Sequence, residues 1–192
     1  NPDRTLQCSC YPFPSPLNEL LRWTSLGVVV GHLPGLRERY LPTSSHRFAR
    51  PADWVVGAAL AIRRKAFETV GGFDESFFMY SEEVDLCYRL RQAGWETHFA
   101  PVTEVVHLGG ASTARYRGAM AAQLFASLEQ FYRRHYPHSR RLGLKLVLTY
   151  LMLRNVAQGY LHGRSRSDTE HTGVAEDMAA WRRVLAEVWR RW

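Results

Sequence analysis

The segment 71–90, which reads GGFDESFFMYSEEVDLCYRL, constrains the fold more than any other part of the chain. Its two glycines predict the end of one helix, and Ser81 followed by two acids predicts the start of a second helix that ends at Gly94. Its carboxylates lie among Phe, Tyr, Met and Leu, in a chain of formal net charge +7. This pattern indicates a partly dry pocket, where a base or a cation site could form. The carboxylates are Asp74, Glu75, Glu82, Glu83 and Asp85.

Hydrophobic patterning on both sides of this segment predicts an α/β fold. Apolar runs predict strands at residues 54–62, 95–100 and 102–108. Shorter patterns predict helices at residues 16–23 and 63–70, the first with a proline near its first turn.

The last third of the sequence is predicted to be helical. One helix runs from Met120 until Pro137, and a second covers about residues 142–161. A polar linker then precedes a final helix at residues 174–192, whose Trp, Leu, Val and Met stripe is separate from its arginines. Two interpretations of this last helix are open. It lies on an anionic lipid leaflet, or it packs on the preceding helix or in a coiled coil.

Composition limits the class of protein. A chain of 192 residues with 46% hydrophobic residues forms one ordinary domain with an appendage, and is not largely disordered. Three cysteines without metal-site spacing favour free thiols in a reducing compartment. The longest apolar run contains Lys145 and is too short for a membrane span of about 20 residues. The net charge of +7 indicates an anionic partner: a lipid surface, nucleic acid or a phosphate-bearing substrate.

Glu83 and His107 are the candidate chemical groups. A general base needs a fixed position, and the first turn of a helix supplies one. Acids in a first turn are also favoured by the helix dipole alone, at about 0.3–1 kcal/mol each, so a purely structural role for Glu83 stays open. His107 lies where a predicted strand passes into a loop, which suits a ligand, although a single histidine is more often structural.

Many spaced positions carry a resemblance to a known family. They comprise the run WVVGA from Trp54, the turn GGFDE, the run YSEEVDL from Tyr80, and single residues at Pro101, His107 and Ser112. This set resembles the C-terminal half of a family 2 glycosyltransferase over roughly residues 3–115. It is most similar to the rhamnosyltransferase-like members that build bacterial surface polysaccharides.

The resemblance implies a GT-A fold, an α/β sandwich whose N-terminal half binds a nucleotide-sugar and whose C-terminal half holds the acceptor and the base. Glu82 and Glu83 stand where the family has a Glu-Asp pair, so Glu83 replaces the aspartate that acts as catalytic base. His107 stands at the position of a divalent-cation ligand, for Mg²⁺ or Mn²⁺. The resemblance also implies the residues of the acceptor and donor cleft: Trp54, Gly57, Ala58, Asp74, Glu82, Asp85 and Arg89. Of these, Asp74 is expected mainly to fix a loop and only secondarily to contact an acceptor. Asp85 is expected to pair with Arg89 rather than to react.

The family's Asp-x-Asp motif, which supplies most of the metal ligands, does not occur in this chain. We therefore expect a piece of a longer enzyme, with an acceptor-binding and catalytic-base half at residues 1–137 and a helical extension at residues 138–192. Association with a membrane surface is one interpretation of this extension. The opening NPDRTLQ, with neither an initiator Met nor a signal peptide, supports this expectation.

The implied activity is inverting transfer of a sugar from a nucleotide-sugar to a hydroxyl of a glycan or lipid-linked acceptor, in cell-surface polysaccharide synthesis. The alternative is a non-catalytic acceptor-binding or membrane-associated module without a donor-binding half. We expect a cytoplasmic location, peripheral on the inner face of the plasma membrane. Arginines that are not interleaved with aromatics do not favour a nucleic-acid partner.

Overall fold

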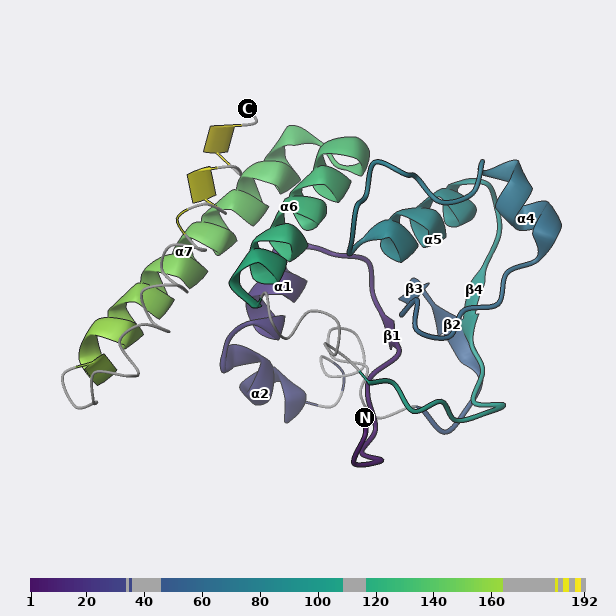
Figure 1. Cartoon of the computed structure of the whole chain (residues 1–192), viewed down its shortest axis with the longest axis horizontal. Helices are drawn as coiled ribbons and strands as arrows, with labels where there is room; N and C mark the ends of the chain where they lie inside the picture. Colours follow the sequence, from purple (N-terminus) through teal and green to yellow (C-terminus); the bar gives the residue numbers. More distant parts are fainter. Residues whose placement is uncertain are drawn as a thin grey trace. The chain divides into compact units, whose positions relative to one another are not determined.

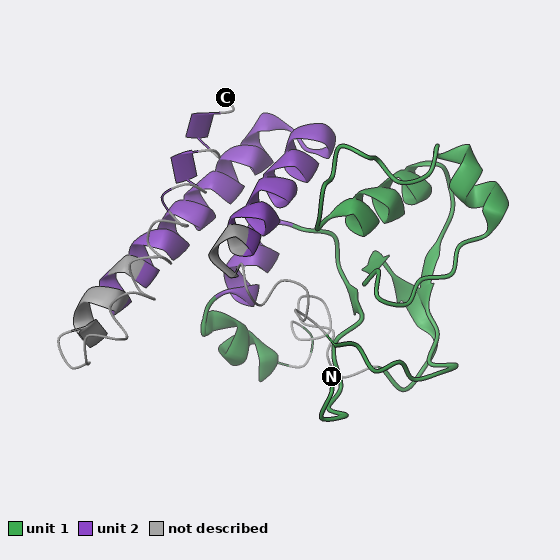
Figure 2. Cartoon of the chain, in the orientation of Figure 1, with its two compact units in different colours: residues 1–14, 24–111 green, residues 15–23, 112–192 purple. Residues whose placement is uncertain are grey.

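The structure is a computed structural model with two compact units. It describes residues 1–33, 35, 46–108, 117–163, 182, 185, 186, 189 and 190. The first unit comprises Asn1–Pro14 and Thr24–Ala111, and the second comprises Ser15–Trp23 and Ser112–Trp192 (Figure 2). The boundary between these units differs from the one expected between residues 137 and 138. The expected boundary separates functional parts rather than compact units, and it stays a prediction.

The first unit contains two short antiparallel strand pairs (Figure 1). Strand β1 (Cys10–Tyr11) pairs with β3 (Trp54–Val55), so that Tyr11 lies opposite Trp54. Strand β2 (Arg50–Ala52) pairs with β4 (Thr97–Phe99). Mixed helix and strand content agrees with the α/β class.

Two of the three predicted strands differ from the structure. The strand predicted at 54–62 is confined to β3, and residues 102–108 form no strand. The third prediction, at 95–100, is confirmed at its centre by β4. An apolar run becomes a strand only where a neighbouring backbone completes its hydrogen-bond ladder. The backbones of β1 and β2 do this for β3 and β4, whereas the segments after β3 and β4 run largely exposed.

Among the described residues, the first unit also contains three short helices: α2 (Leu26–Gly31), α4 (Arg64–Thr69) and α5 (Glu82–Gln92). The helices predicted at 63–70 and from Ser81 to Gly94 are confirmed. Gly71 and Gly72, with φ of 75° and 74°, end α4 in the left-handed region that favours glycine. Leu86 and Leu90 of α5 pack against Ala66 of α4 and form a small buried core.

The second unit is helical, with α1 (Pro16–Arg22), α6 (Arg117–His135) and α7 (His138–Gly163). All three confirm sequence predictions, and α6 and α7 meet at Pro137. Helix α1 is capped by Ser15, whose Oγ accepts the N–H of Asn18 at 3.1 Å. A Cβ at Gly143 of α7 would lie 2.9 Å from Cγ of Pro16, so glycine allows α1 and α7 to approach closely.

The final helix predicted at 174–192 is described at only five positions, while the linker before it lies outside the described residues. Trp189 packs on α7: its Nε1 donates to Thr149 Oγ1 at 3.2 Å, and its ring centre lies 5.4 Å from Lys145 Nζ. This contact agrees with packing on the preceding helix, one of the two open interpretations. In the part of the chain that the structure describes, no helix is both long enough and apolar enough to cross a membrane.

Candidate active site

The backbone immediately before α5 is strained. Tyr80 and Ser81 both adopt left-handed conformations, with φ of 66° and 65°, at a typical cost of about 1–3 kcal/mol each. Ser81 is the N-cap residue, as predicted, although its side chain makes no capping hydrogen bond. Strain of this kind clusters at functional sites, where it holds side chains in one geometry. Here it positions Glu82 and Glu83 as the first two residues of α5.

Glu82 and Glu83 each hold a carboxylate oxygen in a dry environment. Both side chains are half-buried, and the Oε2 atom of each is buried without a hydrogen-bond partner among the described residues. Most buried polar atoms in proteins have such a partner, because leaving one unpaired costs about 1–3 kcal/mol. Two adjacent unpaired carboxylate oxygens are therefore suited to a hydroxyl donor from a ligand.

The environment of Glu83 favours its protonated form. Burial raises the pKa of this carboxyl, and the neighbouring charge of Glu82 raises it further. Hydrogen bonds from the backbone N–H groups of Glu83, Gly57 and Val84 oppose the rise in pKa without cancelling it. A carboxylate with a raised pKa is a stronger base than an ordinary glutamate, as proton abstraction near neutral pH requires.

The raised pKa predicts how stability depends on pH. The folded state binds the Glu83 proton more tightly than the unfolded state, so the free energy of unfolding falls as pH rises from the ordinary value of 4.5 through the raised pKa. A Glu83→Gln variant removes this loss, so we expect it to be more stable than wild type at pH 8 and no more stable at pH 4. The gain should be about 1.4 kcal/mol for each pH unit that separates the two pKa values.

Urea unfolding of both proteins across this pH range measures the difference. The matched control is Glu75→Gln, which changes an exposed carboxyl in the preceding turn. Subtracting variant from wild type cancels the contribution of Glu19, whose pKa is also raised by burial. Equal pH profiles for wild type and Glu83→Gln would contradict the prediction.

The structure brings Gly57 close to Glu83, while the contact of Ala58 with the cleft stays a prediction. Gly57 and Ala58 belong to the exposed loop after β3, and a Cβ at Gly57 would lie 3.8 Å from Cβ of Glu83. Trp54, by contrast, is 7% exposed; its indole N–H donates to Pro12 O at 2.9 Å, and its ring stacks on Tyr11. Its predicted contact with a sugar stays a prediction, while its described contacts hold β1 against β3.

Asp74 shapes the turn before α5. Its Oδ1 accepts the N–H of Ser76 at 2.9 Å, and its backbone oxygen accepts the N–H of Phe77 at 3.1 Å. These bonds form the loop-fixing arrangement expected from the sequence. Contact with an acceptor stays a prediction.

Asp85 and Arg89 form the predicted i,i+4 pair, with Nε of Arg89 donating to Asp85 Oδ2 at 2.7 Å. The other guanidinium nitrogens donate to the backbone oxygens of Val70 and Gly72, at 2.6 and 2.8 Å. Asp85 is completely buried, and this network ties α5 to the turn after α4. The network orients the helix that carries Glu83. Direct contact of Asp85 or Arg89 with a donor or acceptor in the cleft stays a prediction.

His107 lies in the irregular segment after β4, where its Nδ1 is 3.1 Å from Oε1 of Gln7. Over residues 1–33, 46–108 and 117–163, no three His, Cys, Asp or Glu side chains come together in a group that could hold a metal ion. One imidazole nitrogen does not form a site for Mg²⁺, which needs about six ligands that are mostly oxygen atoms. The described residues by themselves therefore do not fit a bound metal.

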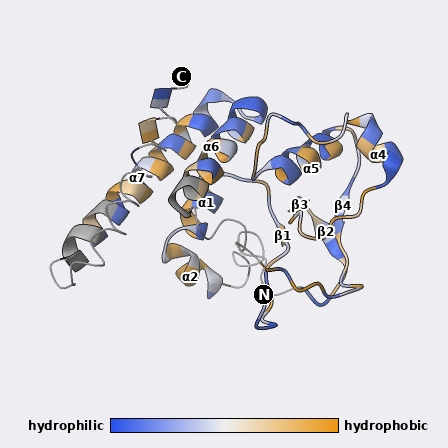
Figure 3. Cartoon of the chain, in the orientation of Figure 1, coloured by the Kyte–Doolittle hydropathy of each residue, from blue (hydrophilic) through white to orange (hydrophobic). Residues whose placement is uncertain are grey.

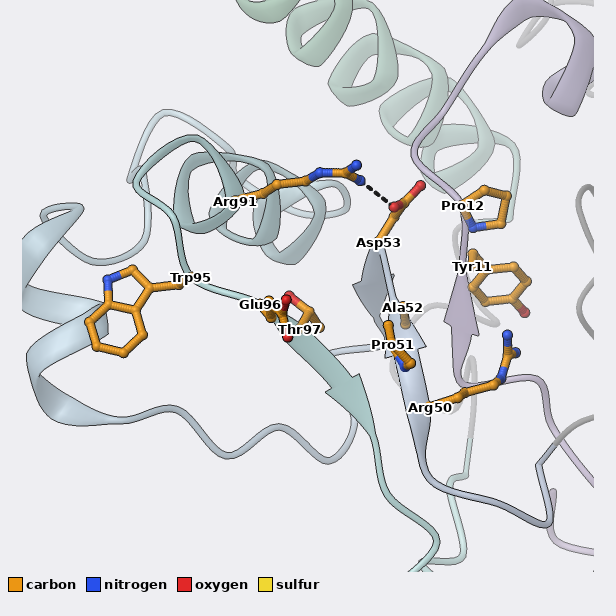
Figure 4. A pocket seen from close by; sticks show the side chains of 10 residues that line it. All are labelled: Tyr11, Pro12, Arg50, Pro51, Ala52, Asp53, Arg91, Trp95, Glu96 and Thr97. Carbon is orange, nitrogen blue, oxygen red and sulfur yellow. Dashed lines mark hydrogen bonds and ion pairs between the residues drawn. The ribbon is translucent and has the colours of Figure 1, made fainter.

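A pocket of about 350 Å³ lies elsewhere in the first unit (Figure 4). None of the predicted site residues lines it. Arg91 of α5 forms an ion pair with Asp53 across its wall, and the other oxygen of Asp53 accepts the N–H of Phe13 at 2.8 Å. Cys10 Sγ accepts a hydrogen bond from Arg50 beside it, and none of the three cysteines forms a disulfide, in agreement with the predicted thiols. Sequence reasoning missed the Asp53–Arg91 pair, because residues 38 positions apart leave no periodic signal.

Comparison with protein families gives a match over much of the chain. The family described as "Glycosyltransferase like family 2" matches residues 19–137, more than half of the sequence. This stretch includes α4, α5 and the Glu82–Glu83 pair. No solved structure matches the chain.

Individual relatives point to the same family. An N-acetylglucosaminyl-diphospho-decaprenol L-rhamnosyltransferase of Mycobacterium tuberculosis is 52% identical over 66 residues, which is 34% of this chain and 22% of that protein. Rhamnosyltransferase WbbL of Escherichia coli is 34% identical over 79 residues, 41% of this chain and 30% of that protein. The low-salt glycan biosynthesis hexosyltransferase Agl10 of Haloferax volcanii is 30% identical over 95 residues, 50% of this chain and 29% of that protein.

In each of these pairs, the matched region spans less than a third of the relative's length. The family match itself covers the helices and turns that position the paired carboxylates. The chain belongs to the glycosyltransferase-like family 2.

Proposed function

We propose that this chain supplies the acceptor-side part of an inverting glycosyltransferase, with Glu83 as its catalytic base. The observation that supports the proposal is the pair of buried carboxylate oxygens at the start of α5, neither of which has a hydrogen-bond partner among the described residues. The raised pKa of Glu83 and the strained backbone before it agree with this role.

In the proposed reaction, an acceptor hydroxyl donates a hydrogen bond to the Glu83 carboxylate. Glu83 takes the proton as the hydroxyl oxygen attacks the anomeric carbon of the donor sugar. A new carbon–oxygen bond forms while the bond to the nucleoside diphosphate breaks on the opposite face, so the anomeric configuration inverts. The backbone of α5, tied down by the Asp85–Arg89 network, keeps the carboxylate in place during proton transfer.

Donor binding requires groups beyond the described residues. The complete protein is proposed to have a GT-A fold and to bind Mg²⁺ or Mn²⁺. His107 would add one ligand to others that the described part of this chain does not provide. The cation would stabilise the charge of the leaving diphosphate.

The acceptor is proposed to be a lipid-linked glycan used in cell-surface polysaccharide synthesis. The name of the mycobacterial relative specifies a sugar linked through diphosphate to decaprenol, a lipid acceptor of this class. Because such an acceptor is held in a membrane, the proposed location is the cytoplasmic face of the plasma membrane. Attachment through residues 174–192 stays a prediction, since Trp189 packs on α7.

The test is transfer by the complete gene product that contains this chain. It is incubated with nucleotide-activated rhamnose or hexoses and a polyprenyl-diphosphate sugar, and the product is analysed by mass spectrometry and NMR. We expect a lipid-linked product with an inverted anomeric centre. Acceptor binding without transfer for any donor would overturn the proposal in favour of a non-catalytic acceptor-binding module. Retention of anomeric configuration would overturn the role of Glu83.

A further inference from the structure

Helix α7 carries apolar side chains on two faces. Leu144, Leu148 and Leu151 are at most 1% exposed and form part of the core of the second unit. A second set recurs every three or four residues and therefore lies along one other face of the helix. This exposed stripe consists of Leu142, Leu146, Tyr150 and Leu153, with exposed fractions of 39%, 58%, 48% and 60%.

The charged side chains of α7 and of the turn before it have one sign. Residues 133–163 contain six Lys and Arg residues and no Asp or Glu. Lys145 is buried, whereas three of the arginines are exposed at the turn between α6 and α7, together with His138. This basic turn consists of Arg133, Arg134, His138 and Arg140. In Figure 3 the turn is hydrophilic, and apolar positions recur along the helix that follows it.

Trp189 does not cover the exposed stripe. It contacts Thr149 and Lys145. Viewed down the helix axis, these two residues lie about 20° and about 60° from Leu142, in the direction opposite to Tyr150. The four stripe residues keep their exposed fractions with this contact in place. The stripe is about 16 Å long, from the 11 steps of about 1.5 Å each between Leu142 and Leu153.

We infer that the exposed stripe of α7 and the basic turn form a docking surface for an anionic lipid bilayer. An amphipathic helix lies in the plane of the interface with its apolar face among the headgroups and upper acyl chains, and cationic side chains nearby bind anionic lipids. The exclusively positive charge of residues 133–163 favours this occupant over an uncharged protein groove. The inference does not depend on Glu83 or on any catalytic activity.

Vesicle co-sedimentation tests the inference. We expect the complete chain to bind vesicles of phosphatidylglycerol and phosphatidylcholine, and to bind phosphatidylcholine alone far more weakly. Combining Arg133→Gln, Arg134→Gln and Arg140→Gln should weaken binding to the anionic vesicles about 100-fold, at about fivefold for each charge. Leu146→Ser with Leu153→Ser should weaken it at least tenfold, because two buried aliphatic side chains are lost.

The matched control is Val28→Ser with Val29→Ser on α2, which alters two exposed aliphatic residues of the first unit and should leave binding unchanged. Circular dichroism checks that each variant is folded. Equal binding to anionic and neutral vesicles would overturn the inference. So would a loss of binding only in Arg182→Gln with Arg190→Gln, which would place the membrane contact in the final segment.

Two further results would assign this surface to a different partner. If wild type is a dimer by light scattering and Leu146→Ser with Leu153→Ser makes it a monomer without a change in vesicle binding, the stripe joins two copies of the chain. If the arginine variants lose binding to single-stranded RNA but keep binding to anionic vesicles, the turn serves nucleic acid. Either result overturns lipid docking.

Discussion

Glu83→Gln should reduce glycosyl transfer by the complete gene product about 10²–10⁴-fold, the usual contribution of a general base. Glutamine keeps the size of the side chain but cannot accept the proton of the attacking hydroxyl. The loss should appear in kcat, while KM for the acceptor changes little, because the amide oxygen still accepts a hydrogen bond. Initial rates over a range of acceptor concentrations measure both quantities.

Two matched variants separate catalysis from structure. Glu75→Gln removes an exposed carboxylate of the same segment and should leave kcat unchanged. Glu82→Gln removes the neighbouring charge that raises the pKa of Glu83, so the acidic limb of the pH–rate profile should move to lower pH. If Glu83→Gln retains turnover within a few-fold of wild type, Glu83 is not the base.

Asp85→Ala should lower the free energy of unfolding by about 3–5 kcal/mol, the usual cost of removing one partner of a buried ion pair. The side chain of Asp85 is 1% exposed and that of Arg89 is 24% exposed, so the substitution leaves a guanidinium charge in a largely dry environment. Because Arg89 also binds the backbone oxygens of Val70 and Gly72, the loss should loosen the contact between α5 and the turn after α4. Urea unfolding monitored by circular dichroism measures the change.

An exposed pair of the same spacing provides the control. Arg64 and Glu68 lie 3.9 Å apart on α4, with side chains 91% and 64% exposed, so Glu68→Ala should change stability by no more than about 0.5 kcal/mol. Replacing Asp85 and Arg89 together by Leu and Met should recover much of the loss, because no uncompensated charge then remains. A loss below about 1 kcal/mol for Asp85→Ala would show that the pair does not hold the helix in place.

The helices of this protein were predictable because their signals are local. Pro16 near the first turn predicted α1, the two glycines predicted the end of α4, and Pro137 separated α6 from α7. Each signal acts within a few residues of the position that it determines. The pair between Asp85 and Arg89 was predictable for the same reason, since one helical turn separates them.

The strands and the geometry of the carboxylate site were not predictable in this way. The run 54–62 has no charged residue and reads as a buried strand, yet only Trp54–Val55 pairs with another backbone. No local pattern marks Tyr80 and Ser81 as left-handed, since neither is a residue type that favours this conformation. The ion pair between Asp53, which directly precedes β3, and Arg91 of α5 joins residues 38 positions apart, so no periodic sequence pattern predicts it.

The sequence alone determined the helices, the basic and amphipathic character of the last third, and the spaced residues that place the chain in its family. These properties depend on residue identity and short-range spacing. The tertiary structure decided which apolar runs become strands, and it decided that Asp85 is bound within a network while Glu82 and Glu83 each keep an unpaired buried oxygen. Burial and hydrogen-bond pairing depend on segments distant in sequence, so five carboxylates of one short segment acquire different chemistry only when the chain folds.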